Sequence, residues 1–309
     1  MKQALQLRSG QSATLAIDRQ APRRLFGEVS NLLKLRIGFV MMLTALVAMV
    51  ATPGRSLDVF ETFVLAMAIL LSAGAAGAFN QYYEVDLDRL MPRTRNRPFV
   101  TGRFQRGPFW IVAMGLLLVI GVGSAALFLN GMAALYTFLG AFFYAIVYTV
   151  WLKRRSWLNI VIGGASGSFA VLAGAAAVDP NLGPVPILLA LALFFWTPSH
   201  FWSLAIAKRK DYACAEVPML PVIIGNQRAA EVVMINTLVL VAISLLPFLF
   251  EMGWIYLLCA GAGGALFIYR NYQMILDPSP RVAMKNFLAS LVQLVLLLIG
   301  ALLDVLVLG

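Results

Sequence analysis

Charged residues are scarce in this sequence. Of its 309 residues only 12% are Asp, Glu, Lys or Arg, whereas 61% are hydrophobic and the mean hydropathy is +0.84. A soluble protein would spread charged groups over its whole surface, and this chain has too few of them to do so. The composition therefore excludes a soluble globular protein and leaves an integral membrane protein as the class that fits.

Cysteine and histidine are also nearly absent. The two cysteines, Cys214 and Cys259, give neither a disulfide framework nor the spacing of a metal site. The single histidine, His200, falls inside an apolar run, where an ionisable side chain is costly and usually functional. We consider two roles for it, an axial haem ligand and a proton carrier.

The N-terminal residues lack the apolar core and the cleavage site of a signal peptide. Residues 1–30 are polar, and we expect a disordered cytoplasmic tail there, followed by one membrane domain over residues 31–309. The Arg and Ser content of the tail also fits a mitochondrial transit peptide, but Asp18 and Glu28 count against one. We therefore expect the cytoplasmic membrane of a bacterium rather than the mitochondrial inner membrane.

Long apolar runs dominate the rest of the sequence. An apolar helix of about 17 to 25 residues can span a bilayer. Nine runs of roughly this kind predict an all-α protein with nine transmembrane helices. The runs cover residues 37–51, 59–82, 109–129, 132–151, 158–178, 185–207, 232–250, 254–269 and 287–307.

The basic residues indicate the orientation of these helices. Of the 24 lysines and arginines, all but Arg55 lie in the N-terminal segment or in the loops on the same side. Basic residues are retained on the cytoplasmic side, so we expect a cytoplasmic N-terminus and a C-terminus on the opposite side. The net charge of +10 then belongs to one face, which suits anionic lipid headgroups or an anionic substrate from the cytoplasm. Nucleic acid fits this pattern poorly.

A polar segment follows the second apolar run and reads NQYYEVDLDRLMPRTRNRP from Asn80 to Pro98. If the helix continues through it, Asn80, Glu84 and Asp88 are spaced by four residues and share one face. Oxygen ligands of this kind suit Mg²⁺, which takes one or two carboxylates and completes its shell with water and phosphate oxygens. Asp86 lies on another face of the same helix.

A simpler interpretation of this segment is that its acids only pair with the neighbouring arginines in a solvated loop. Asn80 counts against it, because this residue lies about 13 Å of helix before Arg89. At that depth an unpartnered amide is costly. We therefore favour a metal site.

A second polar segment follows the sixth run and reads HFWSLAIAKRKDYACAEVPMLP from His200. If the two segments cover one cavity, Asp211 can supply a further metal carboxylate. Opposed carboxylates would then hold Mg²⁺ on a diphosphate and stabilise its departure. Four basic side chains would bind the diphosphate oxygens: Arg93, Arg97, Lys153 and Lys208.

Aromatic residues gather near the same ends of the helices. An interfacial belt explains most of them. Those that face a cavity could stabilise a carbocation through the faces of their rings, as the ionisation of an allylic diphosphate requires. The candidates are Tyr148, Trp202 and Tyr212.

Together these stretches resemble the intramembrane polyprenyl transferases of the UbiA type, and among them the protohaem farnesyltransferases that make haem O. The resemblance covers most of the chain. It is carried by the Asn80 to Pro98 segment, by WTPSHFWSLA from Trp196, by DYACAEVPMLP from Asp211 and by YTVWLKRRSWLNIVIGG from Tyr148. Lys34 and Arg36 also match, and the resemblance implies that they bind diphosphate. Glu84 stands where the superfamily has Asp, a change that keeps the carboxylate.

The resemblance implies a specific reaction. Farnesyl diphosphate would bind through Mg²⁺ and ionise to an allylic cation, which a vinyl group of protohaem (haem B) would capture. Water would quench the resulting cation, giving haem O and free diphosphate. Haem A synthase or oxidase assembly proteins would receive the product in the lipid membrane. The sequence around His200 is what favours haem over other acceptors.

Two other functions stay open from the residues alone. A prenyltransferase for an aromatic acid or chlorophyllide would share the site from Asn80 to Asp88 but would not need His200. A transporter for an anionic metabolite would also place polar groups inside the membrane. A transporter predicts such groups on both sides, however, whereas nearly all candidates here lie on the cytoplasmic half.

Overall fold

The computed structural model of the chain describes residues 21–308 and contains helices but no strands in that range, which confirms the all-α prediction. Long helical segments follow one another along the sequence. They are α2 (Leu35–Val50), α3 (Val59–Tyr83), α5 (Pro108–Phe128), α6 (Gly131–Phe142) with its π-helical continuation η1 (Phe143–Leu152), α7 (Asn159–Val178), α8 (Pro184–Ala207), α11 (Asn226–Leu245), α12 (Trp254–Leu276) and α13 (Pro280–Leu308). Shorter elements lie between them: α1 (Ala21–Leu32), α4 (Val85–Leu90), α9 (Arg209–Cys214), α10 (Leu220–Ile224) and the 3₁₀ turn η2 (Leu246–Leu249).

Each predicted apolar run falls on one of the long segments, but fewer than nine of these segments meet the length and hydropathy expected of a membrane span. Within the described range, seven segments are long and apolar enough to cross a membrane, or eight if the bent pair α1–α2 forms one span. α12 lies outside this set because its glycines and the polar Arg270 and Asn271 lower its mean hydropathy. The chain thus has the helices of a multi-pass membrane protein, while nine spans and the orientation of the termini stay predictions.

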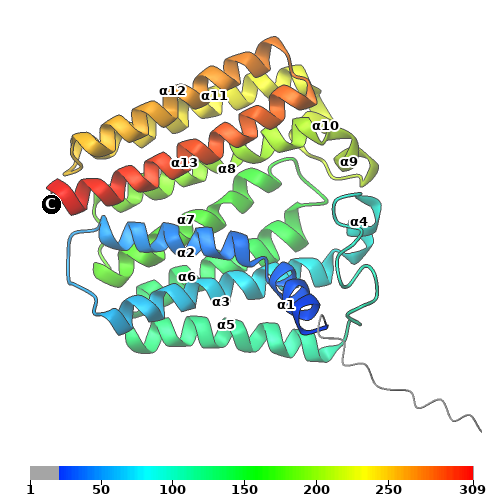
Figure 1. Cartoon of the computed structure of the whole chain (residues 1–309), viewed down its shortest axis with the longest axis horizontal. Coiled ribbons are helices and arrows are strands. Elements are labelled where there is room, and N and C mark those ends of the chain that lie inside the picture. Colours follow the sequence, from blue (N-terminus) through cyan, green and yellow to red (C-terminus); the bar gives the residue numbers. More distant parts are fainter. Residues whose placement is uncertain (1–20, 309) are drawn as a thin grey trace, which may run out of the picture.

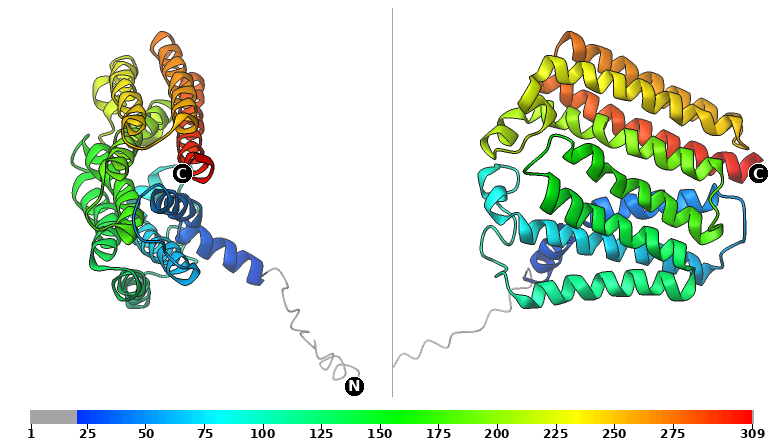
Figure 2. Two further views of the ribbon diagram at one scale, coloured as in Figure 1. Left: turned by 90° about the vertical axis from the view of Figure 1, so that its left-hand side faces the viewer. Right: turned by 180° about the vertical axis from the view of Figure 1, so that it is seen from behind.

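The long helices lie side by side in one bundle (Figure 1). α8, α11, α12 and α13 pack together, and α7 packs against α8 on one side and against α2 and α6 on the other. Figure 2 shows the same bundle from one end and from behind. The short helices α4, α9 and α10 all lie at the end of the bundle away from the C-terminus (Figure 1). The two polar segments of the sequence therefore share one end of the molecule.

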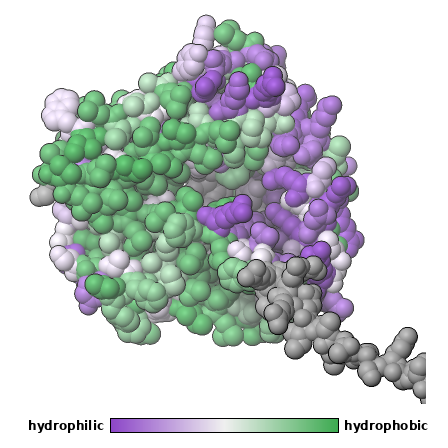
Figure 3. All heavy atoms as spheres, in the orientation of Figure 1, coloured by the Kyte–Doolittle hydropathy of each residue, from purple (hydrophilic) through white to green (hydrophobic). Residues whose placement is uncertain are grey.

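The surface divides in the same way. Hydrophobic side chains cover the length of the bundle, whereas hydrophilic ones gather at the end that carries α4, α9 and α10 (Figure 3). On α5, for example, Phe109, Val112, Leu116 and Val119 are all exposed. Such a continuous apolar surface indicates contact with lipid. The polar end is where the bundle meets water.

Small residues let α7 pass through the centre of the bundle. Its buried face consists mainly of Gly, Ala and Ser. At Gly174 the backbone of α2 comes so close that an added Cβ atom would lie 1.9 Å from the carbonyl oxygen of Ala45. Close backbone approach of this kind drives helix association where lipid gives no hydrophobic force. The contact fixes α2, and with it the residues just before α2, against the core.

The structure corrects the predicted N-terminal tail. α1 begins at Ala21, so the disordered segment predicted for residues 1–30 extends too far, and residues 1–20 lie outside the described residues. α1 is short and amphipathic, a pattern that a search for uniformly apolar runs does not detect. It meets α2 at an angle of 54°.

Candidate active site

The polar segment after α3 stays nearly helical. α3 ends at Tyr83 and α4 begins at Val85, and Glu84 lies between them with φ −96° and ψ 21°. Backbone hydrogen bonds still join residues four apart, from the Glu84 N–H to the Asn80 carbonyl (3.1 Å) and from the Asp88 N–H to the Glu84 carbonyl (2.8 Å). The helix is therefore interrupted at Glu84, but the spacing of the side chains by turns is kept.

Lys34 reaches this segment through the bend between α1 and α2. Its backbone is left-handed, with φ 50° and ψ 42°, and this ends the helical run. The Gln81 amide holds the bend by donating hydrogen bonds to the carbonyls of Asn31 (2.7 Å) and Leu32 (3.2 Å). Gly77 makes room for it, since an added Cβ would lie 3.3 Å from the Cβ of Lys34. The role of Gln81 was not predicted from the sequence.

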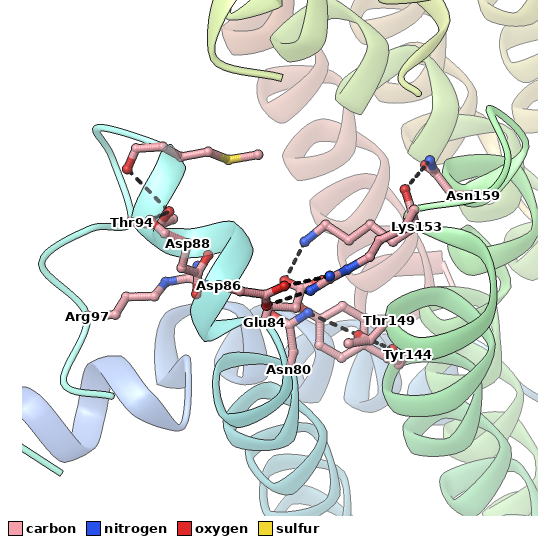
Figure 4. Close-up of polar contacts among 12 residues, drawn as sticks. Asn80, Glu84, Asp86, Asp88, Thr94, Arg97, Tyr144, Thr149, Lys153 and Asn159 are labelled. Carbon is pink, nitrogen blue, oxygen red and sulfur yellow. Dashed lines mark hydrogen bonds and ion pairs between the residues drawn. The ribbon is translucent and has the colours of Figure 1, made fainter. Parts of the chain in front are cut away.

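Asn80 lies at the base of the site with a hydrogen bond at each end of its amide, and Figure 4 shows the one to Thr149. The Lys34 ammonium donates hydrogen bonds to Asn80 Oδ1 (2.6 Å) and to the Tyr144 hydroxyl (2.7 Å). Asn80 donates from Nδ2 to Thr149 Oγ1 (3.0 Å). The amide therefore joins α3 to the residue before α2 and to η1.

Glu84 is fully buried, and only one of its two carboxylate oxygens has a hydrogen-bond partner in the described part of the chain. Lys153 donates from Nζ to Glu84 Oε2 (2.5 Å), whereas Oε1 is buried with no hydrogen-bond partner among the described residues. Burial lowers the pKa of the Lys153 ammonium, and the charge of Glu84 opposes that shift. A buried carboxylate oxygen without a donor is costly. Oε1 is therefore the atom at which this site can accept a cation or a donor from a ligand.

The two other carboxylates of the segment face different surroundings (Figure 4). Asp88 is 2% exposed and accepts a hydrogen bond from Arg97 (2.6 Å). Asp86 is exposed, and two hydrogen bonds of 2.7 Å from Arg154 lower the pKa of its carboxyl to about 2. The prediction that Asp86 points elsewhere agrees with this arrangement. The pairing of acids with basic residues, which we considered a rival interpretation, is also present, but for Glu84 and Asp88 it is buried.

The helical segment η1, which ends just before Lys153, has the wider turns of a π-helix. η1 is π-helical, and π-helical segments are rare and often found at functional sites. Tyr144 and Tyr148 stack with ring centroids 5.6 Å apart, and Lys153 Nζ lies 5.5 Å from the Tyr148 centroid. Tyr148 and Lys153 were among the predicted site residues, whereas Tyr144 and Thr149 were not. Hydropathy does not distinguish a π-helix from an α-helix.

The expected contact between the two polar segments is present. Arg93 donates from Nη2 to the Tyr212 hydroxyl (3.0 Å), and its guanidinium lies 5.3 Å from the centroid of that ring. Tyr212 and Trp202 belong to one buried cluster with Leu87 and Met91 of the first segment. The Trp202 indole N–H is buried without a partner in the described part of the chain.

Among the described residues, three predicted site residues form no ion pair or hydrogen bond with the buried charged side chains of the first polar segment. Arg36 and Lys208 are exposed, and Asp211 is half-buried in α9. None of the three takes part in an ion pair within residues 21–308. Asp211 nevertheless precedes Tyr212, which touches the first segment.

His200 is buried between α8 and α13. Its ring stacks between those of Trp196 and Phe287, with 4.2 Å between centroids on each side. Ser290 Oγ lies 2.6 Å from Nδ1 and donates its own proton to the Phe287 carbonyl (2.6 Å). Because a hydroxyl has a single proton to donate, Nδ1 must be the donor to Ser290. The neutral ring then keeps its lone pair on Nε2, which can accept a proton or bind a metal ion.

The oxygen ligands suit Mg²⁺, although the predicted ligand set is not assembled as one group. Among the described residues, no three His, Cys, Asp or Glu side chains come together as a metal site, so the grouping of Glu84, Asp88 and Asp211 around Asn80 is not present in that form. Mg²⁺ needs only one or two carboxylates and takes the remaining ligands from water and phosphates. The unpartnered Oε1 of Glu84 is an oxygen of the required kind.

Basic side chains outnumber acidic ones around these oxygens. Four basic side chains lie about the buried carboxylates of Glu84 and Asp88, two more than are needed to neutralise them. The excess attracts an anion, and guanidinium groups match the oxygens of a phosphate. The basic side chains are Lys34, Arg93, Arg97 and Lys153.

The buried ion pair allows a stability test. Replacing Lys153 with Met leaves the Glu84 carboxylate without its partner, and breaking a buried pair in this way costs about 3–5 kcal/mol. We expect Lys153→Met to lower the unfolding temperature of the detergent-purified protein clearly. Arg154→Gln is the matched control, because its pair with Asp86 is exposed and should contribute little. Equal unfolding temperatures for the wild type and Lys153→Met would contradict this account of the pair.

The fold and the site together define a membrane protein with a cluster of buried acidic and basic side chains at one end of a helical bundle. The chain belongs to the UbiA prenyltransferase family, whose model matches residues 41–298. It is therefore a prenyltransferase of the membrane.

Two relatives within this family point to a narrower group of prenyltransferases. The chain is 52% identical to protoheme IX farnesyltransferase 2 of Paramagnetospirillum magneticum over 281 residues, which cover 91% of this chain and 98% of the relative. It is 45% identical to protoheme IX farnesyltransferase 1 of the same organism over 280 residues, with 90% and 98% coverage.

Solved structures share the fold at low sequence identity. A digeranylgeranylglyceryl phosphate synthase structure superposes with a TM-score of 0.75 at 16% identity, covering 91% of this chain and 99% of that one. A UbiA homologue from Archaeoglobus fulgidus, bound to DMAPP and Mg²⁺, superposes with a TM-score of 0.66 at 18% identity, covering 91% and 99%. At these identities the likeness establishes the fold alone.

Proposed function

We propose that this protein is a protohaem farnesyltransferase. It transfers the farnesyl group of farnesyl diphosphate to a vinyl group of protohaem, adds water, releases diphosphate and forms haem O. The names of the relatives that match nearly the whole chain support the choice of substrates. The observation that carries the proposal in this chain is the buried Glu84 and Asp88 pair, with one free carboxylate oxygen and an excess of basic side chains around it.

The basic cluster binds the diphosphate in this proposal. Lys34 and Lys153 would contact it from the buried side, and Arg93 and Arg97 from the loop after α4. Arg36 and Lys208 lie exposed at the rim and would attract the anion from the cytoplasm.

The carboxylates hold the metal ion. Glu84 and Asp88 would bind Mg²⁺ together with the Asn80 amide oxygen, and Asp211 would add a carboxylate from the second segment. When bound, Mg²⁺ would neutralise the charge that develops on the departing diphosphate. The protein's own contribution is to position these oxygens by successive turns of α3 and α4.

Aromatic rings stabilise the allylic cation. Tyr148 and Tyr144 stack next to Lys153, and Tyr212 and Trp202 lie in the cluster that joins the two polar segments. Their ring faces can interact with positive charge. The apolar bundle keeps water from the cation before it reaches the acceptor.

We assign His200 to the later part of the reaction, in which water adds to the prenylated haem. Since Nδ1 donates to Ser290, Nε2 has a free lone pair, and we assign it the proton that is released when water adds. Haem O would then leave through the membrane to haem A synthase or to oxidase assembly proteins. The site of action would be the cytoplasmic membrane of a bacterium.

The product tests this function directly. Membranes containing the wild type or Asp88→Ala are supplied with protohaem and farnesyl diphosphate, and the extracted haem is analysed by mass. We expect hydroxyethylfarnesyl haem from the wild type only, and its loss on adding EDTA with recovery on adding Mg²⁺. Absence of modified haem with folded wild-type protein would overturn the haem assignment, and a prenylated aromatic acid in its place would identify the other acceptor class.

A further inference from the structure

A small cavity lies in the middle of the bundle between α2, α7, α8, α11 and α13. It offers about 20 Å³ of space to the centre of a water molecule, which is enough for one water. Its walls are mostly apolar, with side chains such as Val171, Leu193 and Leu297. A single water is stable in such a place only if polar groups hold it.

Gln293 supplies the polar group. The polar side chains on the cavity walls are Thr44, Trp196 and Gln293. The first two have partners, because Thr44 donates to the Val40 carbonyl (2.8 Å) and Trp196 donates from Nε1 to the Ser290 carbonyl (2.8 Å). Gln293 is 1% exposed, and its Oε1 has no hydrogen-bond partner among the described residues. An amide buried in this way costs several kcal/mol unless it binds something.

Trp196 lies between the lining of the cavity and His200, which is not itself a lining residue. Trp196 forms part of the cavity wall and stacks on the His200 ring, four residues later on α8. On α13, Gln293 follows Ser290, which holds His200, by one turn or about 4.5 Å. The cavity therefore lies one turn farther from the polar end than His200, along both helices.

We propose that Gln293 holds the water molecule that adds to the prenylated acceptor. This inference rests on the proposed function. Once the farnesyl group has added to the outer vinyl carbon, the carbon next to the porphyrin is cationic. A lone pair of the water oxygen forms the new C–O bond, one O–H bond breaks with its electron pair staying on oxygen, and the proton passes to His200 Nε2. Gln293 Oε1 accepts a hydrogen bond from the other O–H and so keeps the oxygen lone pair turned towards the cation.

The experiment uses the mass of the product. Without a positioned water, the cation loses a proton instead, and the product is lighter by the mass of one water. We expect Gln293→Met, which keeps the volume but removes the amide, to raise the ratio of dehydrated to hydroxylated farnesyl haem by about tenfold or more. Gln293→Glu keeps an oxygen acceptor of the same shape and should retain the wild-type ratio. Isotopically labelled water should appear in the hydroxyl group of the wild-type product.

A second variant guards against a misfolded Gln293→Met protein. Ala48 also lines the cavity and is 2% exposed, so Ala48→Val should fill the space of the water while leaving the amide in place. We expect the same shift in product ratio. An unchanged ratio in either folded variant overturns the role of Gln293. Wild-type protein that makes no farnesylated haem of either mass would instead overturn the proposed function.

Discussion

Glu84→Gln is expected to reduce prenyl transfer by about 100- to 1,000-fold, the loss typical of removing one well-placed charged or polar group from a transition-state site. The substitution keeps the shape of the side chain and one oxygen, but it removes the charge that Lys153 neutralises. It also removes half of the buried carboxylate pair that we assign to Mg²⁺. The rate of diphosphate release by purified protein with labelled farnesyl diphosphate measures the effect.

Asp86→Asn is the matched control for this substitution. Asp86 lies two residues away in the same segment and changes in the same chemical way, but its carboxylate is exposed and paired with Arg154. We expect its rate to stay close to that of the wild type. If the two variants lose activity to the same extent, the buried position of Glu84 is not what matters.

Gly174→Ala is expected to destabilise the fold by more than about 3 kcal/mol, at or beyond the upper end of ordinary overpacking. The added methyl group would lie 1.9 Å from the Ala45 carbonyl oxygen, and this neighbour is backbone, which cannot rotate away. α2 and α7 would have to separate. The unfolding temperature in detergent should fall by about 5 °C or more.

Gly115→Ala is the control for this stability prediction. Gly115 lies on the exposed side of α5, and an added Cβ would meet nothing within 4 Å. Ala at such a helical position is more stable than Gly by about 0.5–1 kcal/mol. We therefore expect an unchanged or slightly higher unfolding temperature. A similar fall in both variants would point to glycine replacement in general rather than to the contact with α2.

The helices and the meeting of the two polar segments could be predicted because hydropathy and charge are local properties of the sequence. Every predicted apolar run is helical in the structure. The two polar segments also meet, through Arg93 and Tyr212. The spacing of Asn80, Glu84 and Asp88 by turns is kept even though the helix breaks at Glu84, but the predicted metal ligands do not come together as one group among the described residues.

The bends and the pairings could not be predicted because they depend on contacts between distant residues. The bend at the left-handed Lys34 is held by hydrogen bonds from Gln81, which lies in the last turn of α3 and is far from Lys34 in the sequence. Glu84 pairs with Lys153, which is 69 positions later, rather than with a neighbouring arginine. The amide of Gln293 stands out only when the apolar side chains around it are known.

The π-helical form of η1 makes the site depend on the number of residues in the chain as well as on their identity. The Lys153 N–H bonds to the Tyr148 carbonyl, five residues back instead of four. Deleting one residue within η1 would remove the extra residue that the wide π-helical turns accommodate and would let the segment relax to an α-helix. Tyr144, Tyr148 and Lys153 would then lose their present spacing along the segment, although no side chain of the site had been replaced. For relatives of this protein, insertions and deletions in this short stretch are therefore a more sensitive indicator of a changed site than substitutions.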